Sequence, residues 1–527
     1  MLISMHSKKG TDRMTPGYQS PPRCHLPYLL SGIGLAACLL AAGPAFAGAF
    51  NFTANDIVVS SSTYAGTTST VTVGQALPGG GTATNDGSFP GVFLNSSVDG
   101  TFGITSPINL TEIDPNSGAV AGVLAVPTSD VVTSFSSKSE LSLNLSQNGQ
   151  VLSFIGYQAG VNQLDISNDN TPGAIDPNNP DTAGPSYRVV TSVAADGSIS
   201  TTTTNAFSGD NGRAAIVANN GLIYAAGNAG QTKKPPSAVV NSAGAQIITP
   251  GVNATASTPG TQQAGVYNIT QNGLPADKTS KDNNFRGVTI ANNTLYVSKG
   301  SGGNGINGVY QVGTAGTLPT AASVNSALAA GTPTMTLLPG FPVASAKNAT
   351  DSSLYSFGMF FANADTLYVG DEGPQDLNFD PNAGLQKWSL INGAWQLDYT
   401  LQSGLNLDQS YTVAGLGYDI ANTGLRDITG RVNADGTVSL FGIGATYGTN
   451  PLDGDPGADP NAVFQITDNL AAMTLPANES FSTLVAPVLG VVNRGVSYTP
   501  VPEPGSLALL GTGVLGMLAL IRRRRQR

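Results

Sequence analysis

Residues 292–299 read Asn-Asn-Thr-Leu-Tyr-Val-Ser-Lys, a polar turn followed by a short run of β-forming side chains. The same unit returns along the chain, each time after a turn that contains Asn or Asp. The aromatic residues that mark its copies are Phe154, Tyr224, Tyr296, Tyr368 and Phe441. Successive marks are separated by about 72 residues, and such a regular spacing indicates a structural repeat. A degenerate first copy is expected at residues 57–59.

Two further kinds of strand recur between these marks. Copies of the first kind are predicted at residues 109–113, 163–166, 266–269, 309–312, 385–388 and 463–466. Copies of the second kind are predicted at residues 120–126, 335–338, 395–401 and 481–485. Several short strands per repeat, without sustained helical periodicity, predict an all-β, β-propeller-like fold. We expect about six blades and leave seven open; the alternative is a tandem of β-sandwich domains, which the single repeating unit disfavours.

Composition narrows the function classes. Charged residues make up 11% of the 527 residues, against about 25% in ordinary soluble domains. Both histidines and both cysteines lie within the first 38 residues. If that segment is removed, the mature protein has no Ser-His-Asp or Cys-His catalysis, no imidazole-bound metal and no disulfide.

The charge of the body narrows the classes of partner. Without the four basic residues of the N-terminus and the five of the C-terminal cluster, residues 48–501 carry 14 Lys and Arg against 31 Asp and Glu, a net charge of −17. Such a surface repels nucleic-acid phosphates and attracts divalent cations. No nucleic-acid partner is therefore expected.

The N-terminus has the features of a secretory signal helix. Four basic residues precede an apolar run at residues 29–42, and Ala45-Phe46-Ala47 then supplies the small-x-small pattern that signal peptidase requires. We expect residues 1–47 to be removed by cleavage after Ala47. Two alternatives stay open: Leu35-Ala36-Ala37-Cys38 is a lipobox-like sequence, and translation could start at Met14 instead of Met1.

The C-terminus has three parts. Pro502, Glu503 and Pro504 are followed by an apolar run at residues 505–521 and then by the basic cluster Arg522, Arg523, Arg524 and Arg525. As a helix, these 17 residues would extend about 26 Å, enough to span a thin membrane. The arginines would hold the C-terminal end in the cytoplasm. This order predicts a transmembrane helix at residues 505–521.

This tail resembles the PEP-CTERM protein-sorting signal of Gram-negative bacteria that make extracellular polysaccharide. The resemblance covers residues 501–527 and implies that an exosortase, a membrane cysteine protease, recognises Pro502, Glu503 and Pro504 and removes the tail. The protein would then be anchored transiently in the inner membrane before it reaches the outer surface or the medium. A permanent single-span anchor is the alternative. The predicted organisation is a signal peptide at 1–47, a propeller-like domain at 48–497 and a sorting signal at 498–527.

The body resembles exported, β-propeller-like bacterial proteins of uncharacterised function. The similar segments are residues 110–118, 140–149 and 384–390. This loose resemblance spans most of the body and implies no particular activity.

One charged position recurs in the repeat. Arg213, Arg286 and Arg426 each stand a short way before an aromatic mark, and Glu140 has the matching place in an earlier copy. If this position lies on the innermost strand of each blade, the four side chains surround one mouth of the central channel. They would bind an anion or a carboxylate, such as an acidic sugar, or they would fill space and tie the blades together.

Two tryptophans flank a strong hairpin turn at Asn392-Gly393. In that register Trp388 pairs with Leu397 and Trp395 pairs with Leu390, so that all four side chains share one face. Such a pair could stack on sugar rings, but the neighbouring leucines favour a contact between blades.

Three acidic loops contain oxygen ligands of the kind that Ca²⁺ takes. The best candidate is formed by Asp453, Asp455 and Asp459, and the other two lie at residues 165–181 and 371–380. None has EF-hand spacing, so no cofactor is required and a structural Ca²⁺ is left open. Two functions follow: a non-catalytic matrix or cell-surface protein that binds exopolysaccharide, or a Ca²⁺-dependent propeller hydrolase or lyase with an extracellular substrate.

Overall fold

The computed structural model describes residues 50–502, apart from residues 96–101, 138, 180–183, 231, 233, 265–283, 301–304, 332–334, 344–353, 375–377, 379 and 449–455. The predicted signal peptide with Ala45 and Ala47 lies outside the described residues. So do Glu503, Pro504, the helix predicted at 505–521 and the cluster Arg522–Arg525. Within the described residues, no helix is long and apolar enough to cross a bilayer.

Six antiparallel sheets of four or five strands form the body; they are here called blades 1 to 6 and given from the inner strand outward. A seventh sheet of the described residues has only two strands, β2 (Thr105–Ser106) and β5 (Thr133–Ser134). Blade 1 contains β27 (Val491–Tyr498), β1 (Ile57–Thr63), β3 (Ile108–Ile113) and β4 (Val120–Ala125), and blade 2 contains β6 (Asn144–Leu145), β7 (Val151–Tyr157), β8 (Arg188–Ala194) and β9 (Ile199–Thr204). Blade 3 contains β10 (Gly212–Val217), β11 (Ile223–Gly227), β12 (Gly244–Ile248) and β13 (Gln262–Gln263), and blade 4 contains β14 (Phe285–Ala291), β15 (Thr294–Lys299), β16 (Gly308–Val312) and β17 (Met335–Leu337). Blade 5 contains β18 (Ser356–Asn363), β19 (Thr366–Asp371), β20 (Gly384–Ile391) and β21 (Ala394–Leu401). Blade 6 contains β23 (Asp419–Val432), β24 (Thr437–Gly448), β25 (Val463–Asn469) and β26 (Ser482–Val485), with β22 (Ser410–Thr412) beside β23.

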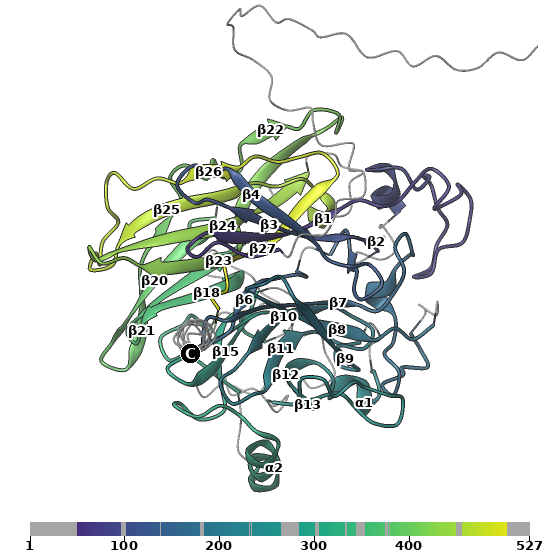
Figure 1. Cartoon of the computed structure of the whole chain (residues 1–527), viewed down its shortest axis with the longest axis horizontal. Helices are drawn as coiled ribbons and strands as arrows, with labels where there is room; N and C mark the ends of the chain where they lie inside the picture. Colours follow the sequence, from purple (N-terminus) through teal and green to yellow (C-terminus); the bar gives the residue numbers. More distant parts are fainter. Residues whose placement is uncertain are drawn as a thin grey trace, which may run out of the picture. The chain divides into compact units, whose positions relative to one another are not determined.

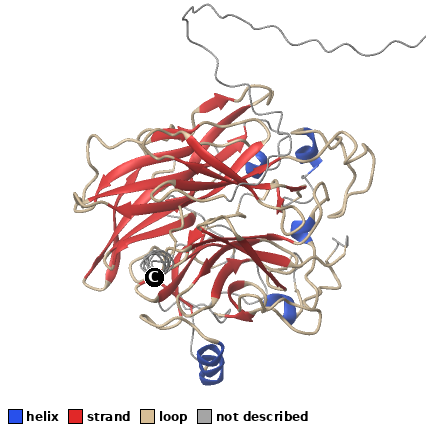
Figure 2. Ribbon diagram, in the orientation of Figure 1, coloured by secondary structure: helices blue, strands red, loops and turns tan. Residues whose placement is uncertain are grey.

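The inner strands close into a ring. Each contacts the inner strand of the next blade, in the order β27, β6, β10, β14, β18, β23 and back to β27. The blades are arranged around this ring (Figure 1). The body is therefore a six-bladed β-propeller, which settles the number of blades that the repeat left open. Figure 2 shows that strands dominate and that the described helices lie in loops; the two α-helices are α1 (Ser237–Val240) and α2 (Ala321–Ala330).

Blade 1 joins the two ends of the body. Its inner strand β27 is the last strand of the described residues and pairs antiparallel with β1, with Tyr498 opposite Ile57 and Val496 opposite Val59. β1 contains the degenerate first copy predicted at residues 57–59. In Figure 1 β27 lies beside β1, although the two strands stand at opposite ends of the body in the sequence. Because residues 48–501 contain no cysteine, this strand pair closes the ring without a disulfide.

The predicted strands fall into definite places in the blades. The segments predicted at 109–113, 309–312, 385–388 and 463–466 lie in β3, β16, β20 and β25, the third strand of their blades. All four predicted segments of the second kind match outer strands, namely β4, β17, β21 and β26. The prediction at 163–166 was wrong: Ile166 begins a 3₁₀ turn, and the third strand of blade 2 is β8. Residues 266–269 lie outside the described part.

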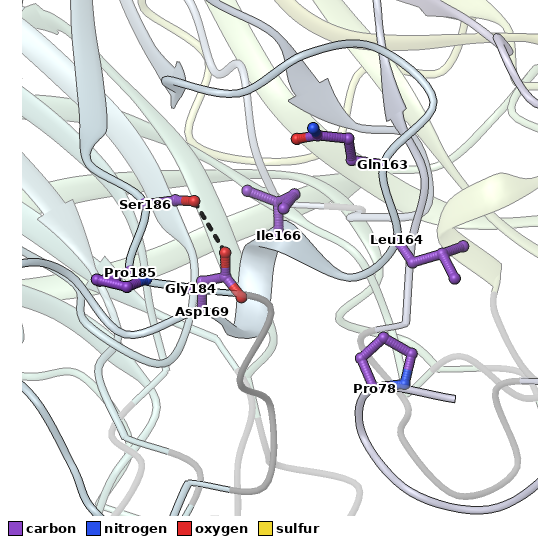
Figure 3. A pocket seen from close by; sticks show the side chains of 8 residues that line it. All are labelled: Pro78, Gln163, Leu164, Ile166, Asp169, Gly184, Pro185 and Ser186. Atoms are coloured by element: carbon purple, nitrogen blue, oxygen red, sulfur yellow. Dashed lines mark hydrogen bonds between the residues drawn. The ribbon is translucent and has the colours of Figure 1, made fainter. Parts of the chain in front are cut away.

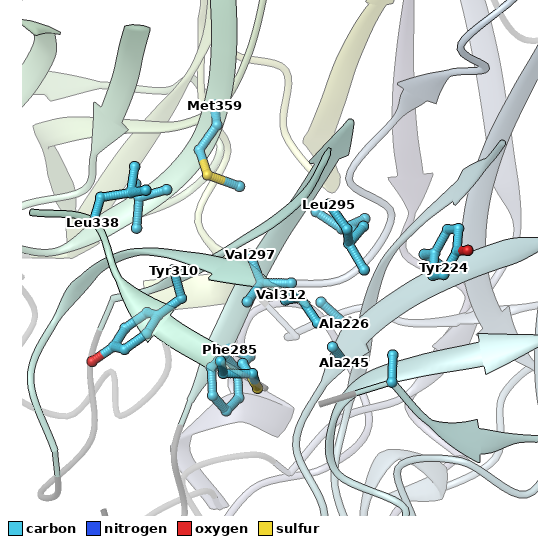
Figure 4. Packing of buried hydrophobic residues seen from close by; sticks show 14 of the residues in the cluster. Tyr224, Ala226, Ala245, Phe285, Leu295, Val297, Tyr310, Val312, Leu338 and Met359 are labelled. Atoms are coloured by element: carbon cyan, nitrogen blue, oxygen red, sulfur yellow. The ribbon is translucent and has the colours of Figure 1, made fainter. Parts of the chain in front are cut away.

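Apolar clusters between neighbouring blades form the core. In the largest, residues of blades 3, 4 and 5 interdigitate, and Figure 4 shows Tyr224 and Ala226 of blade 3 near Leu295 and Val297 of blade 4. The repeated aromatics point toward the next blade. Tyr224 donates to the carbonyl of Pro319 in blade 4 (2.6 Å), and the rings of Tyr296 and Phe361 are 4.6 Å apart. The interfaces between blades 3 and 4 and between blades 4 and 5 therefore each contain one of the aromatic marks, a type of side chain that supplies a large contact area.

Tyr368 and Phe441 also point toward the next blade. The Tyr368 hydroxyl donates to Asp468 of blade 6, and the ring of Phe441 meets Tyr498 of blade 1 edge to face at 5.8 Å. Tyr224, Tyr368 and Phe441 are buried, whereas Tyr296 is half-buried. Four of the five aromatic marks therefore occupy equivalent places.

Phe154 is the exception, and its equivalence was predicted wrongly. Its side chain packs with Val58 and Ile108 of the preceding blade. The neighbour Ser153 faces the next blade and donates to the carbonyl of Ala215 (2.8 Å). Side chains alternate along a strand, so the position equivalent to Tyr224 is Val151. Counted from Val151, the step to Tyr224 also agrees better with the spacing of the later marks than the step from Phe154 does.

Candidate functional site

The recurring charged position lies on the inner strands. Arg213 is on β10, Arg286 on β14 and Arg426 on β23, while Glu140 lies just before β6. A fourth arginine, Arg494 on β27, has this place in blade 1. We call these five residues the charged ring.

The local sequence could have revealed Arg494. The segment Arg494-Gly495-Val496-Ser497 repeats Arg286-Gly287-Val288-Thr289. A Cβ atom on Gly495 would lie 2.4 Å from the backbone of Leu141 and of Leu143, because the chain of the next blade passes this close. The repeat hid this copy because β27 follows the other blades in sequence, whereas its partner β1 lies at the other end of the body and carries the degenerate copy, which has no aromatic mark.

Every member of the charged ring is buried, with at most 5% of its surface exposed. Blade 5 has Phe357 in place of a charged residue on its inner strand, and it supplies Glu372 after β19 instead. The two oxygens of Glu372 lie 3.4 Å from Arg286 and 3.2 Å from Arg426. One carboxylate therefore joins the arginines of blades 4 and 6 across blade 5.

The remaining arginine contacts link further parts of the propeller. Arg213 donates to Asn284 and to the carbonyl of Phe285 (3.0 Å), which immediately precede Arg286. Arg286 also donates to the hydroxyl of Ser139, next to Glu140. Arg494 donates to the carbonyl of Phe135. These bonds connect blade 3 to blade 4, blade 4 to the segment before β6, and blade 1 to Phe135.

Glu140 is held by four donors. Its carboxylate accepts from the Thr133 hydroxyl (2.6 Å), the Ser134 N–H (3.0 Å), the Asn211 amide (2.8 Å) and the Tyr157 hydroxyl. Burial raises the pKa of Glu140, and the hydrogen bonds from Thr133 and Tyr157 oppose that rise. These partners support the structural interpretation, in which the ring ties blades together; its role in ligand binding stays a prediction.

A second buried carboxylate lies next to the ring. Asp427 of blade 6 accepts the Ser142 hydroxyl at 2.7 Å, and its other oxygen accepts the N–H groups of Leu143 (3.1 Å) and Val496 (3.0 Å). It thus joins blade 6 to blades 1 and 2 beside the closing strand. Burial raises the pKa of Asp427 to about 7, although all of these hydrogen bonds lower it.

Sequence reasoning missed the role of both carboxylates. Asp427 did not stand out, because it does not recur with the repeat. Glu372 was noticed only within the acidic loop at residues 371–380, as part of a calcium candidate. Their positions in the repeat could have pointed to both carboxylates. Asp427 lies on β23 and Glu372 lies directly after β19, and the repeat locates both strands.

The tryptophan hairpin has the predicted register: Trp388 lies opposite Leu397, and Leu390 lies opposite Trp395. Both tryptophans are buried, and Trp388 stacks on Phe341 with ring centroids 4.2 Å apart. The register places all four side chains on one face, as predicted, but Leu397 lies on the outer strand and is 39% exposed. The pair belongs to the core and offers no exposed platform for a sugar ring.

Only some residues of the calcium candidates lie within the described part of the chain. Asp453 and Asp455 lie outside the described residues. Asp459 is buried and accepts the hydroxyl of Tyr418 at 2.9 Å. Within the described residues, no three His, Cys, Asp or Glu side chains gather in a way that could hold a metal ion. A structural Ca²⁺ in these loops stays a prediction.

The comparisons with solved structures show low similarity. A putative 6-phosphogluconolactonase from Bacteroides uniformis is 12% identical over 84% of this chain and 99% of its own, with a TM-score of 0.33. The GH74 enzyme of Niastella koreensis is 15% identical over 73% of this chain and 56% of its own, with a TM-score of 0.32. At these values neither likeness bears on activity. The search of curated proteins gave no match.

The comparison with family models gave a specific result at the C-terminus. Residues 500–525 match the PEP-CTERM protein-sorting motif. The match includes Pro502, Glu503, Pro504 and the cluster Arg522 to Arg525, the residues that the sequence singled out. Proteins with this motif are exported and processed by an exosortase. The chain therefore carries a PEP-CTERM sorting motif at its C-terminus, behind a body arranged as a six-bladed β-propeller.

Proposed function

We propose that the protein is a non-catalytic binding protein of the cell surface or extracellular matrix that associates with exopolysaccharide. In this proposal a signal peptidase removes residues 1–47, an exosortase cuts near Glu503-Pro504, and the propeller is released from its transient anchor in the inner membrane. The observation that carries the proposal is the sorting motif at residues 500–525, placed directly after the strand that closes the propeller.

The position of the motif lets the tail be removed without opening the ring. β27 ends at Tyr498, one residue beyond the predicted domain boundary. The backbone continues to bond to the body, because Thr499 N–H donates to the Asp56 carbonyl (3.0 Å) and Val501 N–H donates to the Gly149 carbonyl (2.8 Å). A cut after Glu503 would leave all of these bonds in place. The released domain would then extend from Gly48 to about residue 503.

Intact-mass analysis of the exported protein tests the processing. We expect a chain that begins at Gly48 and ends near residue 503. A protein with lipid on Cys38 would contradict the proposed signal peptide. An extracellular protein that keeps Arg522 to Arg525 would contradict removal of the tail.

Co-sedimentation with exopolysaccharide purified from the producing bacterium tests the binding role. The mature protein should sediment with the polymer, and the interaction should persist in salt, because a body with a net charge of −17 gains no general attraction from an acidic polymer. An exported protein that stays entirely in the supernatant would refute the binding role and leave the processing untouched.

A further inference from the structure

A pocket of about 460 Å³ lies beside the loops of blade 2, outside the charged ring. Four apolar side chains line it, from Pro78, Leu164, Ile166 and Pro185. Three polar side chains complete the lining, from Gln163, Asp169 and Ser186 (Figure 3). The pocket therefore presents polar and apolar surface in about equal parts, and its volume falls within the range of small-ligand sites.

Asp169 is the unusual member of this lining. The residue is 1% exposed, and its Oδ2 accepts the Ser186 hydroxyl at 2.8 Å. Its Oδ1 is buried and has no hydrogen-bond partner among the described residues. In Figure 3 this oxygen points away from Ser186, toward the side of the pocket where Pro78 lies. A buried oxygen without a donor is costly, so the pocket offers a ligand an unused acceptor.

The wall that carries Asp169 is held in place by Arg188. This arginine, on β8, donates to the carbonyls of Ser186 (3.0 Å), Ser167 (2.8 Å) and Asp210 (2.6 Å). Its guanidinium carbon lies 5.1 Å from the centre of the Tyr157 ring. The loops on both sides of Asp169 are therefore fixed to one buried cation, which is the support that a preorganised binding site needs.

The lining narrows the class of ligand. A carboxylate in the pocket disfavours an anion. A divalent cation takes several oxygen ligands, and no three acidic side chains gather within the described residues. The apolar side chains suit the C–H face of a ring, and the carboxylate accepts from a hydroxyl group. Gln163 adds a donor, because its Oε1 is engaged by the Gly160 N–H (3.2 Å) and its amide nitrogen remains for a ligand.

We propose that this pocket binds a neutral sugar residue, one hydroxyl of which donates to Oδ1 of Asp169. The inference rests on the proposed function, because it names the class of ligand that the exported propeller takes from an exopolysaccharide. The pocket gives the sugar a binding position, and Asp169 gives it a group that orients it. The sorting motif provides neither.

Binding should depend on pH. Burial raises the pKa of Asp169 to about 6, while the Ser186 hydroxyl and the positive charge of Arg188, the charged group acting on this carboxyl, lower it. The ionised carboxylate is the better acceptor. Affinity should therefore increase as the pH rises from 5 to 7. An Asp169→Asn variant should lack this dependence.

The test uses the mature exported protein and a panel of methyl glycosides of glucose, galactose, mannose and rhamnose. Saturation-transfer NMR identifies binders and calorimetry measures their affinity. We expect at least one glycoside to bind and Asp169→Asn to weaken it tenfold or more. Asp196→Asn, on the exposed turn between β8 and β9 of the same blade, is the matched control and should leave the affinity unchanged. Melting temperatures show that each variant is folded.

The outcomes separate the alternatives. If no glycoside binds at 20 mM, or if Asp169→Asn binds as well as the wild type, the proposal is wrong. If only glucosamine or CaCl₂ binds in an Asp169-dependent way, the site takes a cation and the neutral-sugar proposal is also wrong. Because the assay needs no sorting, its failure is distinguishable from a failure of processing. Polymer binding that survives Asp169→Asn would place the polysaccharide elsewhere on the body.

Discussion

The carboxylate of Asp427 provides a sharp test of how the propeller closes. It is buried, and it accepts two backbone N–H groups and one hydroxyl from blades 1 and 2. We predict that Asp427→Asn keeps all three contacts. The amide oxygen can accept from Leu143 and Val496, as Oδ2 does now. The amide nitrogen would then donate to Ser142, whose hydroxyl can reverse its role.

The size of the expected change in the free energy of unfolding follows from the raised pKa of Asp427. Folding shifts the pKa of this carboxyl from its ordinary 3.8 to about 7, so the folded state binds its proton more tightly than the unfolded state. The stability from that proton is fully present below pH 3.8 and is lost as the pH rises to about 7. The difference is worth at most roughly 4 kcal/mol. Relative to the wild type, Asp427→Asn should be near neutral at pH 4 and stabilised by up to about 4 kcal/mol at pH 8.

Urea unfolding of the mature protein and of Asp427→Asn at pH 4, 6 and 8 measures this difference. Asp427→Ala is the informative comparison, because it leaves the buried donors without an acceptor. Relative to Asp427→Asn, which also cannot titrate, it should lose about 3 kcal/mol or more at every pH. A constant difference between wild type and Asp427→Asn over this range would show that Asp427 does not titrate as argued. A destabilised Asp427→Asn at pH 8 would show that the charge itself holds the three donors.

Three further predictions concern the rest of the molecule. Deleting Arg522 to Arg527 should impair processing at the membrane while the melting temperature of the body stays unchanged; normal processing at Glu503-Pro504 would show that the cluster is not needed. Gly495→Ala should prevent stable closure, because its Cβ would lie 2.4 Å from backbone atoms of Leu141 and Leu143, and circular dichroism of a soluble, native-like variant would contradict this. Tyr368→Ala and Phe441→Ala should each cost about 3–5 kcal/mol in urea unfolding, as large truncations in a core do, and losses below about 1 kcal/mol would argue against the packing between blades.

The period of the repeat was enough to predict the propeller. Strand units that recur at a regular spacing, each after a polar turn, cannot bury their faces alone and therefore stack on one another. The outer strands β4, β17, β21 and β26 were located for the same reason. The face of a strand was harder to assign. Phe154 is aromatic and close to the expected spacing, but an odd-numbered shift along a strand turns a side chain to the opposite face, and only Ser153 shows the true register.

The charged ring was predictable where it recurs and hidden where it does not. Arg213, Arg286 and Arg426 stand at a similar distance before an aromatic mark. Glu372 stands after its mark, in the one blade whose inner strand has Phe357, and its role depends on two arginines of other blades, one well before it and one well after it in the sequence. A compensating residue of this kind follows from three-dimensional proximity, which no single-sequence pattern contains.

The position of β27 connects the fold with the sorting of the protein. The strand that completes the ring is the last strand of the described residues, and the match to the sorting motif begins two residues after it ends. If the cut falls at Glu503-Pro504, the exosortase acts within three residues of Val501, whose N–H still bonds to Gly149 of blade 2. On the proposed processing, we expect the protease to act close to the closed propeller. The match to the sorting motif therefore begins next to the strand that closes the ring, where Thr499 and Val501 are still bonded to the body.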